Sequence, residues 1–203
     1  MSLAFGGPGR PTGADPALFG FERGSLRWVR QMDPHIRGIT GVWPSRDRAR
    51  YGSGSLKLTC DLRGGNADWR NGEAFVDLRY LGLGNSGASF NLNGQPVTGS
   101  VWCPTGARGD AATPNRVRLV VKDAGWHNLY SAWSAVNERR WLDLSVIVSA
   151  TAPPDGYADP GFDPTAIGAV GLDFSLGEGS TASYAGPIYL DGVTVGNLGA
   201  APA

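Results

Sequence analysis

Short runs in which apolar and polar residues alternate recur along most of the chain. Examples are Leu56–Cys60, Val117–Val121, Leu144–Val148 and Val170–Phe174, each with apolar side chains at every second position. Alternation with a period of two places the apolar side chains on one face of a strand. The pattern therefore predicts half-buried β-strands, with Asp173 pointing away from the core.

Turn-forming residues separate these runs. Gly, Asn, Asp and Pro mark hairpin-type connections at 64–66, 93–96 and 123–125. The best helix candidate, Ser131–Arg140, contains Trp, Val and Asn, which are weak helix formers. About nine or ten short strands without a convincing helix are typical of an antiparallel β-sandwich.

Composition fits the same architecture. The 203 residues include 31 Gly and 14 Pro, and 41% are hydrophobic, which suffices for one core. No apolar run approaches the roughly 18 residues of a membrane span, so no membrane partner is expected. Gly/Pro-rich residues 1–17 are predicted to be a flexible tail, residues 18–197 the folded domain and residues 198–203 a second tail. The Pro-rich loop 151–165 is unusually long, and loops of that length commonly have a role.

Charge is balanced overall but unevenly distributed. The chain has 18 basic and 18 acidic residues, and every basic residue lies at or before Arg140. Two domains of opposite charge would explain this, and so would one domain whose last strands lie beside its first; ordinary solvated faces need neither. The zero net charge argues against a nucleic-acid partner.

The two cysteines, Cys60 and Cys103, leave open one disulfide or two buried thiols. Residues 1–7 lack a basic start and an apolar run, so they do not read as a signal peptide. The expectation is either a cytosolic protein or a piece of a larger secreted one.

Sequence features of an enzyme are weak. Only two histidines, His35 and His127, could serve as the base beside a Ser or Cys nucleophile. No strand offers two carboxylates on one face for glycoside hydrolysis, and metal-ligand spacings and phosphate loops are missing. No catalytic residue is predicted.

Seven tryptophans are many for one domain. The residues next to each one in the sequence separate those expected in the core from those expected at the surface. Trp141 begins an apolar strand and is expected in the core, whereas Trp43 lies in a Gly/Pro-containing segment. Trp69 and Trp126 lie among polar residues close to turns. Those residues are Asp68, Arg70 and Asn71 around Trp69, and Lys122, His127 and Asn128 around Trp126.

Such surroundings suit a sugar ligand. An indole ring stacks on the C–H face of a sugar ring, and Arg, Asp, Asn or Gln bond its hydroxyl edge. We therefore predict Trp69 and Trp126 as platforms, with Arg70, Lys122 and Asn128 as polar partners. For each tryptophan the alternative is that it fills the core. Trp beside Arg also suits single-stranded nucleic acid, which the neutral charge disfavours.

A calcium site is a third possibility. In residues 188–195 the core-facing positions step by three at Asp191-Gly192, which indicates a β-bulge. Glu22 lies near the first strand, and terminal strands of a sandwich often pair. Carboxylates and backbone carbonyls are the ligands that Ca²⁺ prefers, and the turn 51–55 could supply carbonyls. Alternatively, Glu22 pairs with Arg23 or Arg27, and Asp191 caps the bulge.

Several segments, in this order, resemble a known family. They are Phe21-Glu22-x-Gly24 with Trp28, then 52–58, then 117–123 followed by Trp126, and finally 186–193. Over residues 18–197 the chain resembles the jelly-roll, galactose-binding-domain-like carbohydrate-binding modules of bacterial polysaccharide-degrading enzymes, especially mannan- and glucan-binding ones. The loop 151–165, with Tyr157, has no simple counterpart there.

The resemblance implies a non-catalytic module that binds a β-mannan or β-glucan as part of a larger secreted enzyme, itself a monomer. It implies a structural Ca²⁺ joining the first and last strands, held here by Glu22 and Asp191. It also implies aromatic platforms on the concave sheet or its rim. Trp69 and Trp126 match such platforms in position, and Trp28 and Trp43 are further candidates.

Two rival functions stay open. One is a β-sandwich lyase or glycanase that acts on an acidic glycan with Arg and a Tyr or His. The other is a structural accessory domain of a larger glycoside hydrolase, in which every tryptophan would be buried.

Overall fold

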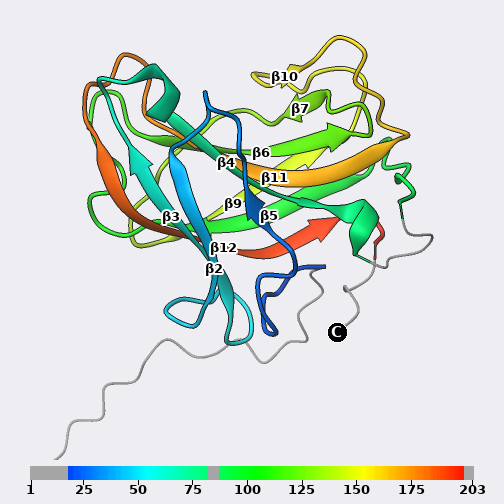
Figure 1. Cartoon of the computed structure of the whole chain (residues 1–203), viewed down its shortest axis with the longest axis horizontal. Coiled ribbons are helices and arrows are strands. Elements are labelled where there is room, and N and C mark those ends of the chain that lie inside the picture. Colours follow the sequence, from blue (N-terminus) through cyan, green and yellow to red (C-terminus); the bar gives the residue numbers. More distant parts are fainter. Residues whose placement is uncertain (1–17, 82–86, 199–203) are drawn as a thin grey trace, which may run out of the picture.

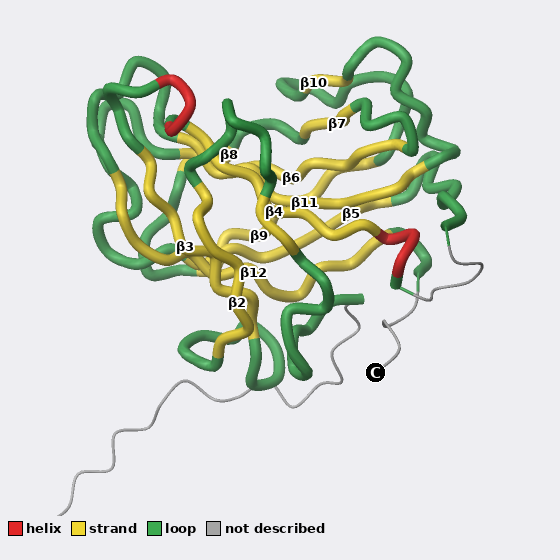
Figure 2. Tube along the Cα trace, viewed as in Figure 1, coloured by secondary structure: helices red, strands yellow, loops and turns green. Residues whose placement is uncertain are grey.

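The computed structural model describes residues 18–81 and 87–198, which form two antiparallel β-sheets packed in two layers (Figure 1). Its helices are two single 3₁₀ turns, η1 (Ala67–Trp69) and η2 (Leu78–Tyr80), so the described part of the chain has no α-helix (Figure 2). None of these helices has the length and apolar character that a membrane crossing needs. The antiparallel sandwich predicted from the sequence is confirmed.

One sheet has seven strands in the order β1-β4-β11-β6-β7-β10, with β8 pairing β6 beside β7. The sheet is assembled from segments far apart in the sequence, because β11 lies between β4 and β6. Its strands are β1 (Val29–Arg30), β4 (Asn71–Asp77), β6 (Arg116–Asp123), β7 (Asn128–Tyr130), β8 (Ser134–Ala135), β10 (Tyr157–Ala158) and β11 (Ile167–Ser175).

The other sheet has five strands in the order β2-β3-β12-β5-β9. Strand β12 pairs with both β3 and β5, so the last strand of the domain lies in the middle of this sheet. Its strands are β2 (Ile39–Ser45), β3 (Ser55–Leu62), β5 (Pro96–Trp102), β9 (Trp141–Ile147) and β12 (Tyr184–Val195).

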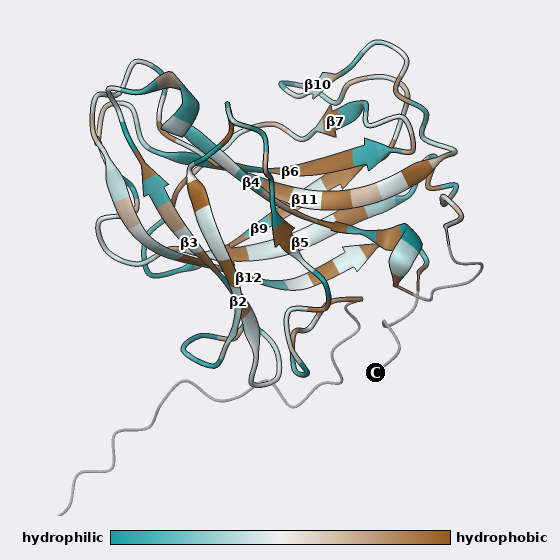
Figure 3. Ribbon diagram, in the orientation of Figure 1, coloured by the Kyte–Doolittle hydropathy of each residue, from teal (hydrophilic) through white to brown (hydrophobic). Residues whose placement is uncertain are grey.

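The core lies between the sheets, where the alternating apolar positions meet (Figure 3). Leu58 of β3 and Leu172 of β11 are fully buried there. Cys60 and Cys103 are free, buried thiols, which excludes the disulfide. Burial raises the pKa of both thiols, that of Cys103 to about 12, so neither is a thiolate at neutral pH.

The bulge predicted in the last strand is present. The pairing of β12 with β5 shifts in register between Asp191 and Thr194. Within this irregular stretch, Val193 exchanges two backbone hydrogen bonds with Phe19, at 3.0 and 3.2 Å. The first and last segments of the described domain therefore lie side by side, as expected.

Two local features can be compared with the sequence. As the weak helix formers indicated, residues 131–140 form no helix; they contain β8, and their backbone bonds other segments, such as Val136 N–H to the Asn115 carbonyl at 2.8 Å. The assignment of Trp141 to the core is wrong. Trp141 is half-buried on the outer side of β9, where it pairs with Trp102, because Leu142 and Leu144 take the inward positions.

The long loop 151–165 is partly ordered by the sheet. Tyr157 and Ala158 form β10 against β7, and Phe162 is buried. The predicted tail 1–17 and residues 199–203 lie outside the described residues. Leu198, assigned to the second tail, bonds the Val195 carbonyl and packs against the core.

Candidate functional site

The outer face of the seven-stranded sheet carries a dense group of charged and aromatic side chains. Register explains it: Ala74, Leu172 and Leu119 share one cross-strand row and point into the core, so the neighbouring rows point outward. We call these outward residues the sheet face. They are Glu73, Phe75, Arg118, Lys122, Tyr130 and Asp173.

Two buried ion pairs form its floor. Lys122 Nζ lies 2.9 Å from Glu73 Oε1, and Arg118 Nη2 lies 2.8 Å from Asp173 Oδ2. Burial raises the pKa of both carboxyls, while the neighbouring cation lowers it and does not fully offset the burial. Each buried charge has its own counter-ion, so the floor is locally neutral.

Aromatic rings flank one of these cations. The guanidinium of Arg118 lies 3.7 Å from the ring centroid of Tyr130 and 4.0 Å from that of Trp133. Tyr157 stacks beside Tyr130, with centroids 6.3 Å apart, and is 51% exposed. Burial, together with the nearby carboxylates, raises the pKa of Tyr130, so its hydroxyl stays protonated.

Trp126 is a second open aromatic ring beside the sheet face, besides Tyr157. It is 46% exposed and meets the edge of Phe75 at a centroid distance of 5.7 Å and an interplanar angle of 82°. Its backbone φ is +67°, a left-handed conformation that a bulky residue adopts only when its surroundings impose it.

The constraint comes from Asp123 at the end of β6. Its carboxylate accepts hydrogen bonds from the backbone N–H of His127 at 2.9 Å and of Asp163 at 2.9 Å. Burial acts to raise the pKa of Asp123, but these bonds and the His127 ring outweigh it and hold the pKa below its ordinary value. The ionised carboxylate therefore fixes the turn that presents Trp126.

Lys122 and Asn128 were predicted as polar ligand contacts, and the structure assigns them internal partners instead. Lys122 is buried, and its ammonium donates to Asn128 Oδ1 at 2.7 Å besides pairing with Glu73. The Asn128 amide in turn donates to Asp159 at 2.8 Å. The two residues tie the loop 151–165 to the sheet.

Arg70 and Trp28 also differ from expectation. The Arg70 guanidinium donates to the carbonyls of Gly64, Ser180 and Gly177 at 2.8–3.1 Å, so it binds loops rather than facing a ligand. Trp28 is only 4% exposed, because its ring packs edge-on against Phe19 and Phe21. It is a core residue, not an open platform.

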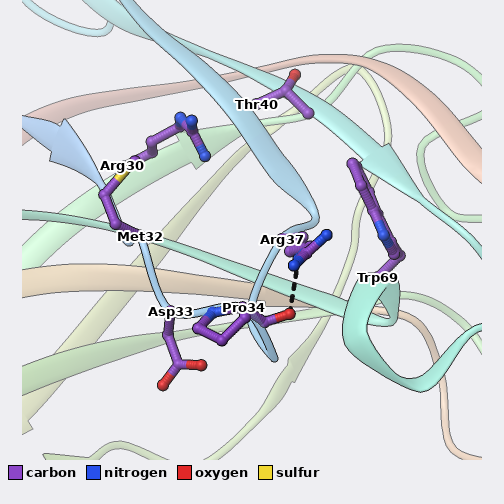
Figure 4. A pocket seen from close by; sticks show the side chains of 7 residues that line it. All are labelled: Arg30, Met32, Asp33, Pro34, Arg37, Thr40 and Trp69. Atoms are coloured by element: carbon purple, nitrogen blue, oxygen red, sulfur yellow. Dashed lines mark hydrogen bonds between the residues drawn. The ribbon is translucent and has the colours of Figure 1, made fainter.

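Trp69 and Trp43 line a groove at one edge of the sandwich, where the segment 28–34 faces β2. We call the two adjoining hollows there the edge groove. One, of about 370 Å³, contains Trp69 (Figure 4). The ring of Trp69 carries the Arg63 guanidinium at 4.1 Å. The other, of about 560 Å³, contains Trp43, which is 60% exposed. Arg30, Met32 and Thr40 line both hollows.

Phe75 connects the groove to the sheet face. It lines the larger hollow, and its ring also contacts Trp126. Of the predicted platforms, Trp69 lines the smaller hollow, whereas Trp126 adjoins the larger one through Phe75. Trp43 lines the larger hollow from the other sheet.

Glu22 and Asp191, the predicted calcium ligands, bind the two ends of one turn. The Glu22 carboxylate accepts hydrogen bonds from Ser53 N–H and Gly54 N–H at 2.5 and 3.0 Å, and that of Asp191 accepts from Arg50 N–H and Tyr51 N–H at 2.6 and 3.0 Å. Among the described residues, no three His, Cys, Asp or Glu side chains gather as a metal cluster.

The sheet face does contain a carboxylate pair that sequence reasoning missed. Glu73 and Asp173 are directly opposite each other on β4 and β11, and facing carboxylates are the residue type on which glycoside hydrolysis depends. Both are bonded to cations and almost fully buried, so neither is presented to a substrate.

The signal for part of this face was in the sequence. Alternation already placed Asp173 outward, and Arg118 occupies the polar position of its own strand. Their pairing required the register of β11 against β6, which no local pattern contains.

No protein-family model matches the chain, and no curated protein matches it by sequence. Solved structures do match. A CBM27 module from Caldicellulosiruptor saccharolyticus, solved with mannohexaose, aligns with a TM-score of 0.58 and 17% identity over 90% of this chain and 97% of that one.

Two further structures are similar over less of their own length. A tandem CBM22 domain from Paenibacillus barcinonensis Xyn10C has a TM-score of 0.50 and 16% identity, with coverage of 96% of this chain and 50% of that one. An exo-β-agarase has a TM-score of 0.53 and 8% identity, with 88% and 25% coverage. Together with the two antiparallel sheets, these matches identify the fold of this chain as the jelly-roll β-sandwich of carbohydrate-binding modules.

Proposed function

We propose that this protein is a non-catalytic module that binds a β-mannan or β-glucan chain. Sugar rings stack on the open indole of Trp126, and neighbouring polar groups bond their hydroxyls. Binding would hold an attached glycoside hydrolase close to its substrate and raise the local substrate concentration.

The observation that carries the proposal is the presentation of Trp126. A large apolar ring is half-exposed in a strained backbone conformation, and a buried carboxylate holds the turn. Backbone strain of this kind costs about 1–3 kcal/mol and persists only where the surrounding structure imposes it, as the Asp123 hydrogen bonds do here. A ring that only filled the core would be covered.

Polar groups suited to hydroxyls lie around the ring. The side chain of His127 is 47% exposed next to Trp126, and the Arg79 guanidinium lies 5.7 Å from the indole centroid. Because the buried charges of the sheet face are paired, the surface favours a neutral glycan over an acidic one. The solved CBM27 module in complex with mannohexaose supports the mannan class.

The same features argue against the lyase alternative. A lyase that used a tyrosine base would need a lowered phenol pKa, whereas the pKa of Tyr130 is raised by burial. Arg118, the nearest guanidinium, is already paired with Asp173.

The attachment to a larger, secreted enzyme is part of the proposal. Matched regions of the agarase and the tandem CBM22 chain make up 25% and 50% of those chains, which supports a module within a longer protein. We propose that the module itself is a monomer.

Gel electrophoresis through embedded polysaccharide tests the function. Migration of this protein should be retarded by β-mannan or β-glucan more than by xylan, and incubation with each polymer should release no reducing sugar. Unretarded migration in all three gels, or release of reducing ends, would overturn the proposal.

We also propose a structural Ca²⁺ at the turn 50–54. The carboxylates of Glu22 and Asp191 reach this turn from the first and last segments of the domain. Calcium takes oxygen ligands, and backbone carbonyls would have to complete the set, because no third ionisable ligand is grouped with them in the described residues. Such an ion would stabilise the junction of the termini without touching the sheet face.

A further inference from the structure

We propose that the glycan does not end at the sheet face but continues over the edge of the sandwich into the edge groove, where Trp43 stacks on a distal sugar. The inference rests on the proposed function. It specifies the ligand as an internal stretch of a long chain that crosses from one sheet to the other.

Three exposed large apolar residues gather along this route. Val29, Met32 and Trp43 are 49%, 71% and 60% exposed, although burial is the norm for large apolar side chains. All three line the larger hollow of the edge groove. Such a concentration on one side of the molecule marks a binding surface rather than scattered surface residues.

The groove is continuous with the sheet face. Val29 pairs with Phe75 across β1 and β4, both line the larger hollow, and Phe75 contacts Trp126. A chain seated on Trp126 therefore meets Phe75 and then the hollow without crossing a ridge of buried core. Volumes of about 560 and 370 Å³ are in the range of small-molecule sites.

The chemistry of the lining suits a sugar better than a second protein surface. Apolar residues lie beside hydroxyl and guanidinium groups, because Thr40 and Arg30 border both hollows and Arg37 borders the smaller one. Arg37 is oriented by donating to the Pro34 carbonyl at 2.7 Å (Figure 4). This combination of ring faces and hydrogen-bond donors matches the two sides of a pyranose.

Trp43 keeps its position as a platform because Gly41, next to its ring, has no side chain. A Cβ on Gly41 would lie 2.6 Å from Trp43 Nε1, closer than atoms approach without displacement. Gly41 thus lets the indole lie along the edge strand β2, and Gly41→Ala should displace the ring without removing it.

Titration calorimetry with short and long sugars tests the inference, using β-1,4-linked mannotriose and mannohexaose and the corresponding cello-oligosaccharides. The wild type should bind the better hexasaccharide more tightly than its trisaccharide. Trp43→Ala should weaken hexasaccharide binding about tenfold and trisaccharide binding less than twofold. Gly41→Ala and Trp69→Ala should have the same length-selective effect, smaller in size.

Ile147→Ala is the matched control. Ile147 is a similarly exposed apolar residue, 52% exposed, on β9 at the opposite edge of the same five-stranded sheet, and its loss should leave both affinities unchanged.

Each of the remaining outcomes overturns either this inference or the proposed function. Unchanged hexasaccharide binding in Trp43→Ala, or equal loss for both lengths, overturns the extended path while leaving the proposed function standing if Trp126→Ala still weakens both. A wild type that binds neither hexasaccharide removes the proposed mannan or glucan function, and this inference with it.

Discussion

Asp123 holds His127 at two points, through the backbone N–H at 2.9 Å and ring Nδ1 at 3.0 Å. Trp126 lies immediately before His127 in the same turn, so the buried carboxylate sets the position of the exposed ring. A residue that never meets the ligand should therefore control binding.

Asp123→Ala should weaken binding of mannohexaose or cellohexaose about tenfold in a protein that keeps its sheet content. The turn loses three hydrogen bonds, and the left-handed conformation at Trp126 is no longer maintained. Calorimetry and far-UV circular dichroism measure the two properties. Asp110→Ala, in a distant exposed loop, is the control, and normal affinity in folded Asp123→Ala would contradict the positioning role.

Acid should destabilise the protein by protonating the carboxyl group of Asp123. Because its folded pKa lies below the ordinary value of 3.8, its stabilising effect is present above that value and is lost as the pH falls through the folded pKa. The melting temperature below about pH 4 should therefore fall more steeply in the wild type than in Asp123→Asn. Identical slopes would show that Asp123 does not contribute to acid unfolding.

The Glu73–Lys122 pair should prove interdependent. Lys122→Met leaves a buried carboxylate beside Asp173 and should lower the free energy of unfolding by about 3 kcal/mol, as breaking a buried ion pair does. Glu73→Leu combined with Lys122→Met should cost much less than the sum of the single changes. Urea unfolding of the four proteins measures this, and simple additivity would refute the coupling.

Arg70 should affect stability and not affinity. Its guanidinium joins three carbonyls of neighbouring loops, and charged hydrogen bonds contribute about 1.5–3 kcal/mol each at most. Arg70→Ala should lower the unfolding free energy by a few kcal/mol while folded protein binds sugar within twofold of the wild type. A tenfold loss of affinity at full stability would restore Arg70 as a ligand residue.

Removal of divalent ions tests the calcium proposal. A chelator should lower the melting temperature by several degrees, and added Ca²⁺ should restore it, while sugar binding to the folded protein persists. Glu22→Gln should abolish the response to Ca²⁺. A melting temperature that changes with neither chelator nor added Ca²⁺ would refute the calcium proposal.

Strands were predictable from the sequence because a period of two is a local property. The alternation at Leu56–Cys60 and Val170–Phe174, and the three-residue step at Asp191-Gly192, correspond to β3, β11 and the bulge of β12. The segment 131–140 has weak helix formers and forms no helix, but its partners were not predictable, since its backbone bonds distant residues such as Asn115 and Cys103 that local propensity cannot reveal.

The site was less predictable because it depends on register and competition for partners. Their polar neighbours in the sequence suggested that Arg70, Lys122 and Asn128 bind the ligand. In the folded protein, carbonyls and carboxylates from other segments already occupy the hydrogen-bonding groups of these side chains. Trp28 and Trp126 are both tryptophans near turns. Trp28 is buried because Phe19 and Phe21 pack against it. Trp126 is exposed because Asp123 fixes the turn that contains it.

The most direct measurement is the affinity of Trp126→Ala for the polysaccharide that the wild type binds best. Loss of the stacking ring should weaken binding at least about tenfold, or about 1.4 kcal/mol, with an unchanged melting profile. Equal affinity of Trp126→Ala and the wild type would contradict the account, because the sugar would then not rest on this ring.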